Sequence, residues 1–160
     1  MQSGYNKLFS RILSGVMVNL FLFSIAQSGD ILFHEEEADH KSIVYRISPE
    51  GTDLIKIGEG LFPQWSPDKK YISYVKGIDP TIIGGLIIIE PSGKEIARIN
   101  AGKEMTSIVR YSWNPNSNGI ALVTTAGRHD ASVIYYDIKT RQMKTLQRVE
   151  FKDLDIAFLT

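Results

Sequence analysis

The chain has 160 residues, of which 43% are hydrophobic and 22% charged, a composition typical of one globular domain. Its 18 basic and 18 acidic side chains cancel, so net charge favours neither nucleic acid nor an anionic membrane as a partner. There is no cysteine, which excludes a disulfide-stabilised scaffold and a lipoprotein anchored through a cysteine.

The first 26 residues have the features of a secretory signal peptide. Lys7 and Arg11 precede an apolar run that extends to Ala26, and Ser24 and Ala26 supply the small residues of a cleavage site. The run is too short to cross a bilayer. The sequence therefore predicts a periplasmic or secreted protein with residues 27–160 as its mature domain. The alternatives are an uncleaved membrane anchor, which would be the chain's one membrane contact, and a buried first helix.

The rest of the chain repeats one pattern. Trp65 and Trp113 are the only tryptophans, and they lie 48 residues apart, each between a strand-like segment and a turn. A period of about 40 to 50 residues that contains several short strands is typical of a β-propeller. At matched positions in such repeats, the two indole rings are expected to pack between neighbouring blades.

The expected strands make an all-β, propeller-like array of four-stranded antiparallel blades that is incomplete. Segments of alternating or β-branched character are separated by Gly, Pro, Asn or Asp, and no long amphipathic helix follows residue 26. The strands amount to three blades, and three blades cannot close a ring. Either the chain is part of a longer propeller, or two copies close head to tail. The expected strands are residues 30–33, 42–47, 53–57, 62–66, 70–75, 85–90, 95–100, 107–113, 119–125, 132–138, 143–148 and 154–160.

One turn carries a family resemblance. Residues 65–70 read Trp-Ser-Pro-Asp-Lys-Lys, and Pro67 and Asp68 suit the two central positions of a type I turn. This segment resembles the Trp-Ser-Pro-Asp-Gly-Lys turn of the TolB-type β-propellers, and the resemblance covers residues 30–160. It implies a propeller scaffold. Lys69 stands where that family has glycine, a departure that costs about 1 kcal/mol if the lysine must adopt the left-handed conformation.

Ionisable residues gather in the loops that a propeller would place on one face. These loops are residues 34–41, 76–84 and 126–131. The connections between blades, residues 58–61 and 101–106, would lie on the same face. Loops on a rigid scaffold are where binding sites arise. Carboxylates and imidazoles in residues 34–40 could bind a divalent cation, but their spacing matches no calcium or zinc pattern, so no metal or cofactor is predicted. The candidate binding residues are His34, Glu35, Glu36, Glu37, Asp39, His40, Asp79, Lys103, Glu104, Arg128, His129 and Asp130.

The sequence gives little support for catalysis. It contains no Gly-x-Ser-x-Gly elbow, no His-Glu-x-x-His, no cysteine nucleophile and no phosphate or dinucleotide loop. We therefore expect a non-enzymatic, exported propeller module that presents a loop face to a protein partner in the cell envelope. The alternative is the substrate-gating propeller of a prolyl-oligopeptidase-like hydrolase whose catalytic domain lies outside this chain.

Overall fold

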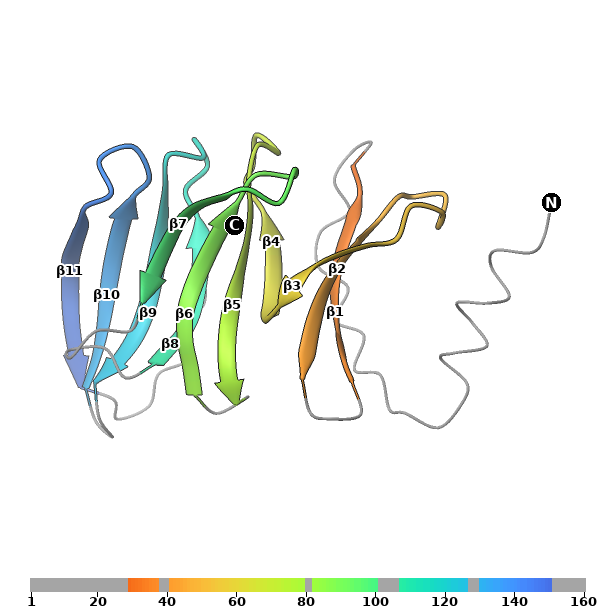
Figure 1. Cartoon of the computed structure of the whole chain (residues 1–160). Coiled ribbons are helices and arrows are strands. Elements are labelled where there is room, and N and C mark those ends of the chain that lie inside the picture. Colours follow the sequence, from red (N-terminus) through yellow and green to blue (C-terminus); the bar gives the residue numbers. More distant parts are fainter. Residues whose placement is uncertain (1–28, 38–40, 80–81, 101–106, 127–129, 151–160) are drawn as a thin grey trace.

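The computed structural model describes residues 29–37, 41–79, 82–100, 107–126 and 130–150. Within them the chain forms eleven strands in three antiparallel sheets, which stand in one row as three blades (Figure 1). Blade A comprises β1 (Ile31–Glu36), β2 (Ser42–Ile47) and β3 (Ile55–Glu59); blade B comprises β4 (Leu61–Trp65), β5 (Ile72–Asp79), β6 (Ile82–Ile89) and β7 (Glu95–Asn100); blade C comprises β8 (Ser107–Trp113), β9 (Gly119–Ala126), β10 (Asp130–Asp137) and β11 (Met143–Glu150).

Each blade is a meander in which consecutive strands are neighbours in the sheet. This confirms the predicted all-β architecture of propeller-like blades. Blades B and C have four strands each, and blade A has three among the described residues. The predicted strand 154–160 and the predicted signal peptide lie outside the described residues. None of the described segments is a helix long and apolar enough to cross a bilayer.

Blade B is packed on both of its faces. Residues 86–89 of β6 are each at most 4% exposed. Because side chains alternate along a strand, Ile87 and Ile89 join the apolar cluster shared with blade A, whereas Leu86 and Ile88 join the cluster shared with blade C. A strand that is buried on both faces needs an uninterrupted apolar run, so β6 does not alternate between apolar and polar residues.

Both tryptophans join neighbouring blades, as predicted. Trp113 of blade C is 8% exposed, its ring stacks on Tyr71 of blade B with centroids 6.1 Å apart, and its Nε1 donates to Oγ of Ser73 over 2.8 Å. Trp65 of blade B is half-buried, and its Nε1 donates to the carbonyl oxygen of Asp30, before blade A, over 2.9 Å. Each indole therefore adds a directional bond to the apolar packing between blades.

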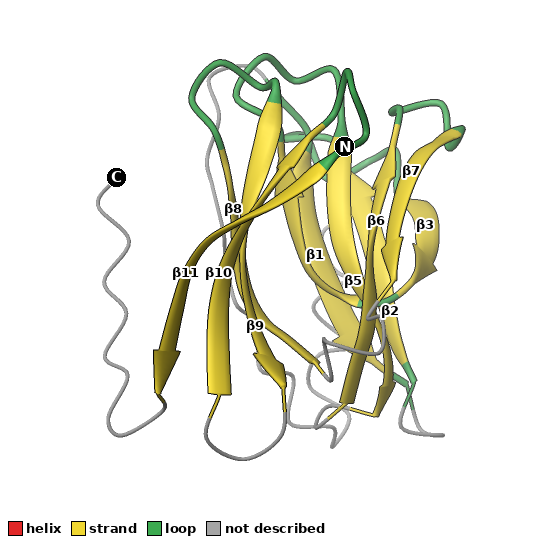
Figure 2. Ribbon diagram, turned by 90° about the vertical axis from the view of Figure 1, so that its left-hand side faces the viewer, coloured by secondary structure: helices red, strands yellow, loops and turns green. Residues whose placement is uncertain are grey.

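The turns after β4 and β8 share one backbone geometry. Lys69 has a φ of 61° and Ser117 a φ of 58°, and these residues lie 48 positions apart in the repeat. Lys69 thus adopts the left-handed conformation at the position where the TolB-type turn has glycine. The amide of Asp68 donates to the hydroxyl of Ser117 over 2.9 Å, which links the two turns. Figure 2 shows the described hairpin turns, in green, gathered at the upper end of the blades.

The predicted loop boundaries at the opposite end are wrong. His34, Glu35 and Glu36 belong to β1, Asp79 ends β5 and Asp130 begins β10, although all five were expected in loops. The pairing of β1 with β2 continues to the last residue of β1. Backbone groups form this ladder whatever side chains they carry, so the strands extend beyond the point where the apolar pattern stops.

The backbone strain at Lys69 can be tested by substitution. Lys69→Gly removes a strain of about 1 kcal/mol, offset in part by the greater freedom of glycine in the unfolded chain and by the loss of the Lys69 ammonium 5.7 Å from the Trp65 ring. The matched change Lys70→Gly relieves no such strain and lowers stability by about 0.5–1 kcal/mol. We expect denaturant titrations to separate the two variants by about 1 kcal/mol in favour of Lys69→Gly. Equal losses of stability would contradict the assigned strain.

Candidate functional site

Strand ends from all three blades meet on one face, the lower one in Figure 1. There β1, β5 and β9 end, and β2, β6 and β10 begin. We call this the loop face. The backbone of Asp79 lies at this face, at the end of β5. The predicted site residues outside the described part of the chain are Asp39, His40, Lys103, Glu104, Arg128 and His129.

Exposed carboxylates cluster around the loop face. Glu35 and Glu36 end β1, Glu37 follows them, Glu59 ends β3 and Asp130 begins β10. All five are exposed, and we call them the acidic rim. Four of the predicted site residues therefore lie at this face, three at blade A and Asp130 at blade C, and Glu59, which was not predicted, lies there as well.

The rim has polar and basic neighbours among the described residues. The hydroxyl of Tyr45 donates to a carboxylate oxygen of Glu37 over 3.3 Å, and Lys41 and Lys76 are exposed near the same strand ends. Among the described residues no three His, Cys, Asp or Glu side chains are grouped closely enough to hold a metal ion. The described carboxylates of the rim thus form an exposed acidic surface.

Phe62 is an exposed aromatic with an unusual backbone. It lies in β4 with a φ of 53° and is 42% exposed. The pairing of β4 with β5 shifts register between Leu61 and Gln64, so Phe62 lies in a bulge. A positive φ is rare for a bulky residue and costs about 1–3 kcal/mol, so the surrounding contacts must hold it in place.

Tyr111 of blade C supports this bulge. Its hydroxyl makes a hydrogen bond to the carbonyl oxygen of Phe62 and lies 3.0 Å from that of Ser73. The side-chain amide of Gln64 donates in return to the carbonyl oxygen of Tyr111 over 3.3 Å. Burial raises the pKa of Tyr111, so the phenol stays protonated and continues to donate. The exposed ring of Phe62 is thereby held on a buried frame.

His34 packs beside Phe62 and connects it to the acidic rim. The two rings meet edge to face with centroids 5.6 Å apart, and the imidazole is half-buried. Desolvation lowers the pKa of His34, so the imidazole is neutral at neutral pH. His34 thus places an aromatic ring beside Phe62, on the strand that ends in Glu35 and Glu36.

The first strand of blade C presents a related surface. The register of β8 against β9 shifts between Ile108 and Arg110, and Val109 and Arg110 are exposed. Phe62, Val109 and Arg110 were not predicted as site residues, because the alternating pattern of both segments indicates regular strands. One signal was available: Pro63 cannot donate to a strand ladder, which favours a bulge beside it.

Comparisons with known proteins support the fold. No protein-family model matches the chain, and no curated protein matches it in sequence. TolB from Acinetobacter baumannii is similar in structure, with a TM-score of 0.60 and 14% identity over 81% of this chain and 32% of that one. The β-propeller domain of the Trilobed protease from Pyrococcus furiosus gives a TM-score of 0.57 and 13% identity over 82% and 42%.

A peptidase is also similar in structure to this chain. Acylaminoacyl peptidase from Pyrococcus horikoshii gives a TM-score of 0.56 and 12% identity over 82% of this chain and 25% of that one. The chain thus spans less than half the length of each of these three structures. At such identities the likeness shows the fold alone: the described residues form blades of the β-propeller type found in TolB and in peptidase propeller domains.

The buried phenol of Tyr111 predicts a pH dependence of stability. Its pKa in the folded chain is raised above the ordinary value of 10.0, so above that pH the unfolded chain loses a proton that the folded chain keeps. The free energy of unfolding then falls as pH rises, by up to about 1.4 kcal/mol per pH unit. In denaturant titrations at increasing alkaline pH, Tyr111→Phe should show a shallower fall than the parent chain. Equal slopes would contradict the burial of this phenol.

Proposed function

We propose that the chain is an exported, non-enzymatic β-propeller module whose loop face binds a protein partner in the cell envelope. One observation carries the proposal: the exposed ring of Phe62, held in a strained bulge, lies beside the strand whose end begins the acidic rim. An exposed aromatic residue on a rigid support is typical of binding hot spots. The apolar pattern of the first 26 residues supports export.

The rim indicates the chemistry of the partner. Five exposed carboxylates favour a basic segment, since opposite charges speed encounter and exclude acidic competitors. The face of Phe62 can receive an apolar side chain or, through a cation–π contact, a Lys or Arg. A basic segment that contains one apolar residue matches both features.

The alternative is that the loop face borders a catalytic domain. The similarity to the propeller of a protease and to an acylaminoacyl peptidase favours this second function, in which the blades screen substrates. The coding sequence beyond Thr160 separates the two proposals. An α/β-hydrolase domain with a Gly-x-Ser-x-Gly elbow would favour the screening propeller, and further propeller repeats alone would favour the binding module.

Site-directed photo-crosslinking in cells tests the binding face. A photo-reactive residue in place of Glu36, on the loop face, is expected to give a discrete protein adduct. The same residue in place of Glu50, an exposed position in the turn between β2 and β3 at the opposite face, is expected to give none. Adducts at Glu50 alone, or equal adducts at both positions, would contradict the proposal.

The aromatic anchor is tested with matched variants. We expect Phe62→Ala to weaken binding of the crosslinked partner at least about tenfold, the effect of losing a hot-spot side chain. Leu54→Ala is the control, because Leu54 is 46% exposed and precedes β3 on the opposite side of blade A from the loop face. The measurement is a titration of the purified full chain with that partner. Equal affinities of the two variants would exclude Phe62 as the anchor.

A further inference from the structure

The turn between β10 and β11 departs from the repeat of the other blades. In each blade the turn before the last strand contains a left-handed residue, which is Gly51 in blade A, Gly93 in blade B and Arg141 in blade C, with φ angles of 75°, 92° and 58°. The amide of Arg141 donates to the carbonyl oxygen of Asp137 over 2.8 Å and closes the turn. A left-handed backbone is free of strain for glycine but not for arginine. Blade C therefore has a cation where the repeat favours glycine.

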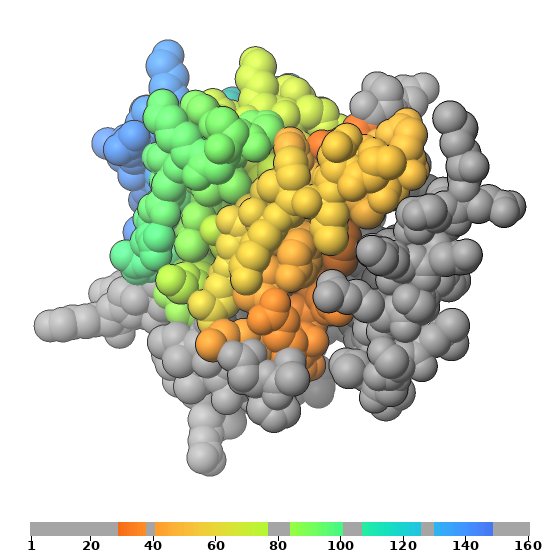
Figure 3. All heavy atoms as spheres, turned by 45° about the vertical axis from the view of Figure 1, so that its right-hand side comes forward, coloured from red at the N-terminus to blue at the C-terminus, as the bar shows by residue number. Residues whose placement is uncertain are grey.

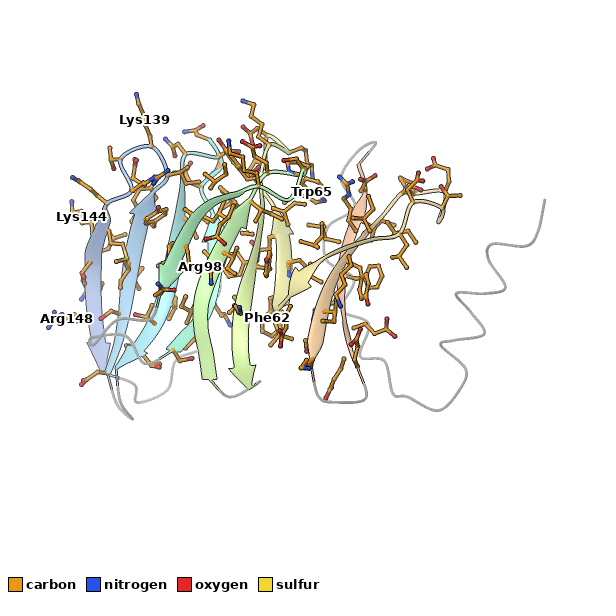
Figure 4. All side chains as sticks on the ribbon, in the orientation of Figure 1. Phe62, Trp65, Arg98, Lys139, Lys144 and Arg148 are labelled. Atoms are coloured by element: carbon orange, nitrogen blue, oxygen red, sulfur yellow. The ribbon has the colours of Figure 1, made fainter. Side chains whose placement is uncertain are left out.

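Three exposed cations lie at this turn. Lys139 and Arg141 belong to the turn, and Lys144 follows it in β11. Figure 4 shows Lys139 at the upper end of blade C and Lys144 below it. None of the three makes an ion pair with a carboxylate of the described residues. Asp137, at the start of the turn, accepts hydrogen bonds from the amide and hydroxyl of Thr140 over 2.7 and 2.9 Å. We call the three cations the basic tip.

The matching turns of the other blades have no such excess of positive charge. In blade B the ammonium of Lys94 lies 3.7 Å from a carboxylate oxygen of Glu90, so these two charges balance. In blade A, residues 48–54 include Glu50 and Asp53 and no basic residue. The net charge of the whole chain is zero. The basic tip is therefore a local feature of blade C.

The position of the basic tip favours a broad surface as its occupant. Figure 3 shows the blue part of blade C at the upper edge of the molecule, away from blade A in orange and yellow. Residues 138–142 contain no aromatic residue, so the tip has no anchor of the kind that Phe62 offers a protein partner. Met143 is 53% exposed and adds one apolar side chain beside the cations. Clustered cations with an apolar neighbour suit the headgroup region of an anionic lipid layer.

The acidic rim favours one orientation on such a layer. The rim lies at the loop face, and the β10–β11 turn lies at the opposite end of the strands (Figure 1). An anionic surface attracts the basic tip and repels the rim. The chain would then meet the surface with the tip of blade C, and the loop face would point away from the lipid.

We propose that the basic tip docks this chain on an anionic lipid surface. Lys139, Arg141 and Lys144 lie against the headgroups, and Met143 enters the boundary between headgroups and acyl chains. The strained backbone of Arg141 then has a role, because it places a cation where the repeat would have none. Each cation strengthens binding about fivefold. This inference goes beyond the loop-face proposal and uses none of its residues.

Cosedimentation with lipid vesicles tests the proposal. The full chain, expressed with its own N-terminal segment, is mixed with phosphatidylcholine vesicles that either contain or lack anionic phosphatidylglycerol. We expect tighter binding to the anionic vesicles, by a margin that shrinks as salt rises. Lys139→Gln and Lys144→Gln should each weaken binding to the anionic vesicles about fivefold. Lys56→Gln is the control, because Lys56 is an exposed cation in β3 of blade A, and it should leave binding unchanged.

Arg141→Gly separates the charge of the tip from its fold. It restores the residue of the other blades, so we expect the same fivefold loss of binding with little loss of stability in a denaturant titration. Equal binding to both kinds of vesicle, or equal losses for Lys56→Gln and the tip variants, would overturn the proposal. Binding to poly-glutamate but not to anionic vesicles would assign the tip to an acidic protein and would overturn it too. Glu36 and Phe62 are unchanged in these variants, so failure here leaves the loop-face proposal to its own crosslinking test.

Discussion

The hydroxyl of Ser73 is the point on which the joint between blades B and C depends. It is fully buried, accepts a hydrogen bond from Nε1 of Trp113 over 2.8 Å, and lies 3.3 Å from both the hydroxyl of Tyr111 and the carbonyl oxygen of Gln64. Apolar residues from both blades surround it. Apolar packing alone would allow one sheet to slide over the other. This buried polar group fixes their register because an unpaired partner would cost about 1–3 kcal/mol.

The candidate site depends on the same joint. The hydroxyl of Tyr111 bonds the carbonyl oxygen of Phe62 and lies 3.0 Å from that of Ser73, so the bulge in β4 is held by blade C as well as by its own sheet. A strained residue persists only where its surroundings determine its conformation. The exposed ring of Phe62 is therefore a consequence of the packing between blades. At Phe62, the apolar character of the loop face therefore depends on the fold.

The sequence predicted the repeat and much of its packing, but only part of the site. The spacing of Trp65 and Trp113 and the turn around Pro67 were sufficient for the propeller-like blades, because those residues report directly on contacts that every blade repeats. The predicted strand ends were wrong at Glu36 and Asp130, because hydrophobic periodicity reflects the burial of side chains and not the pairing of the backbone.

The exposure of Phe62 could not be predicted from the sequence, for a different reason. Phe62 is one of seven phenylalanines, and its exposure depends on a register shift and on a hydroxyl 49 residues away. Likewise, Glu59 joins the rim only through pairing of β3 with β2. Such contacts leave no local pattern. Pro63 indicates a bulge but not the side chain that the bulge exposes.

A double-mutant cycle between Ser73 and Trp113 tests the central claim, that this buried polar contact joins the blades. The free energies of unfolding of Ser73→Ala, Trp113→Phe and the double variant are compared with that of the parent chain. We expect each single change to cost about 1–3 kcal/mol and the pair to be coupled by at least about 0.5 kcal/mol, because the second change removes a partner that the first has already left unpaired. Costs that add to within about 0.3 kcal/mol would contradict the joint.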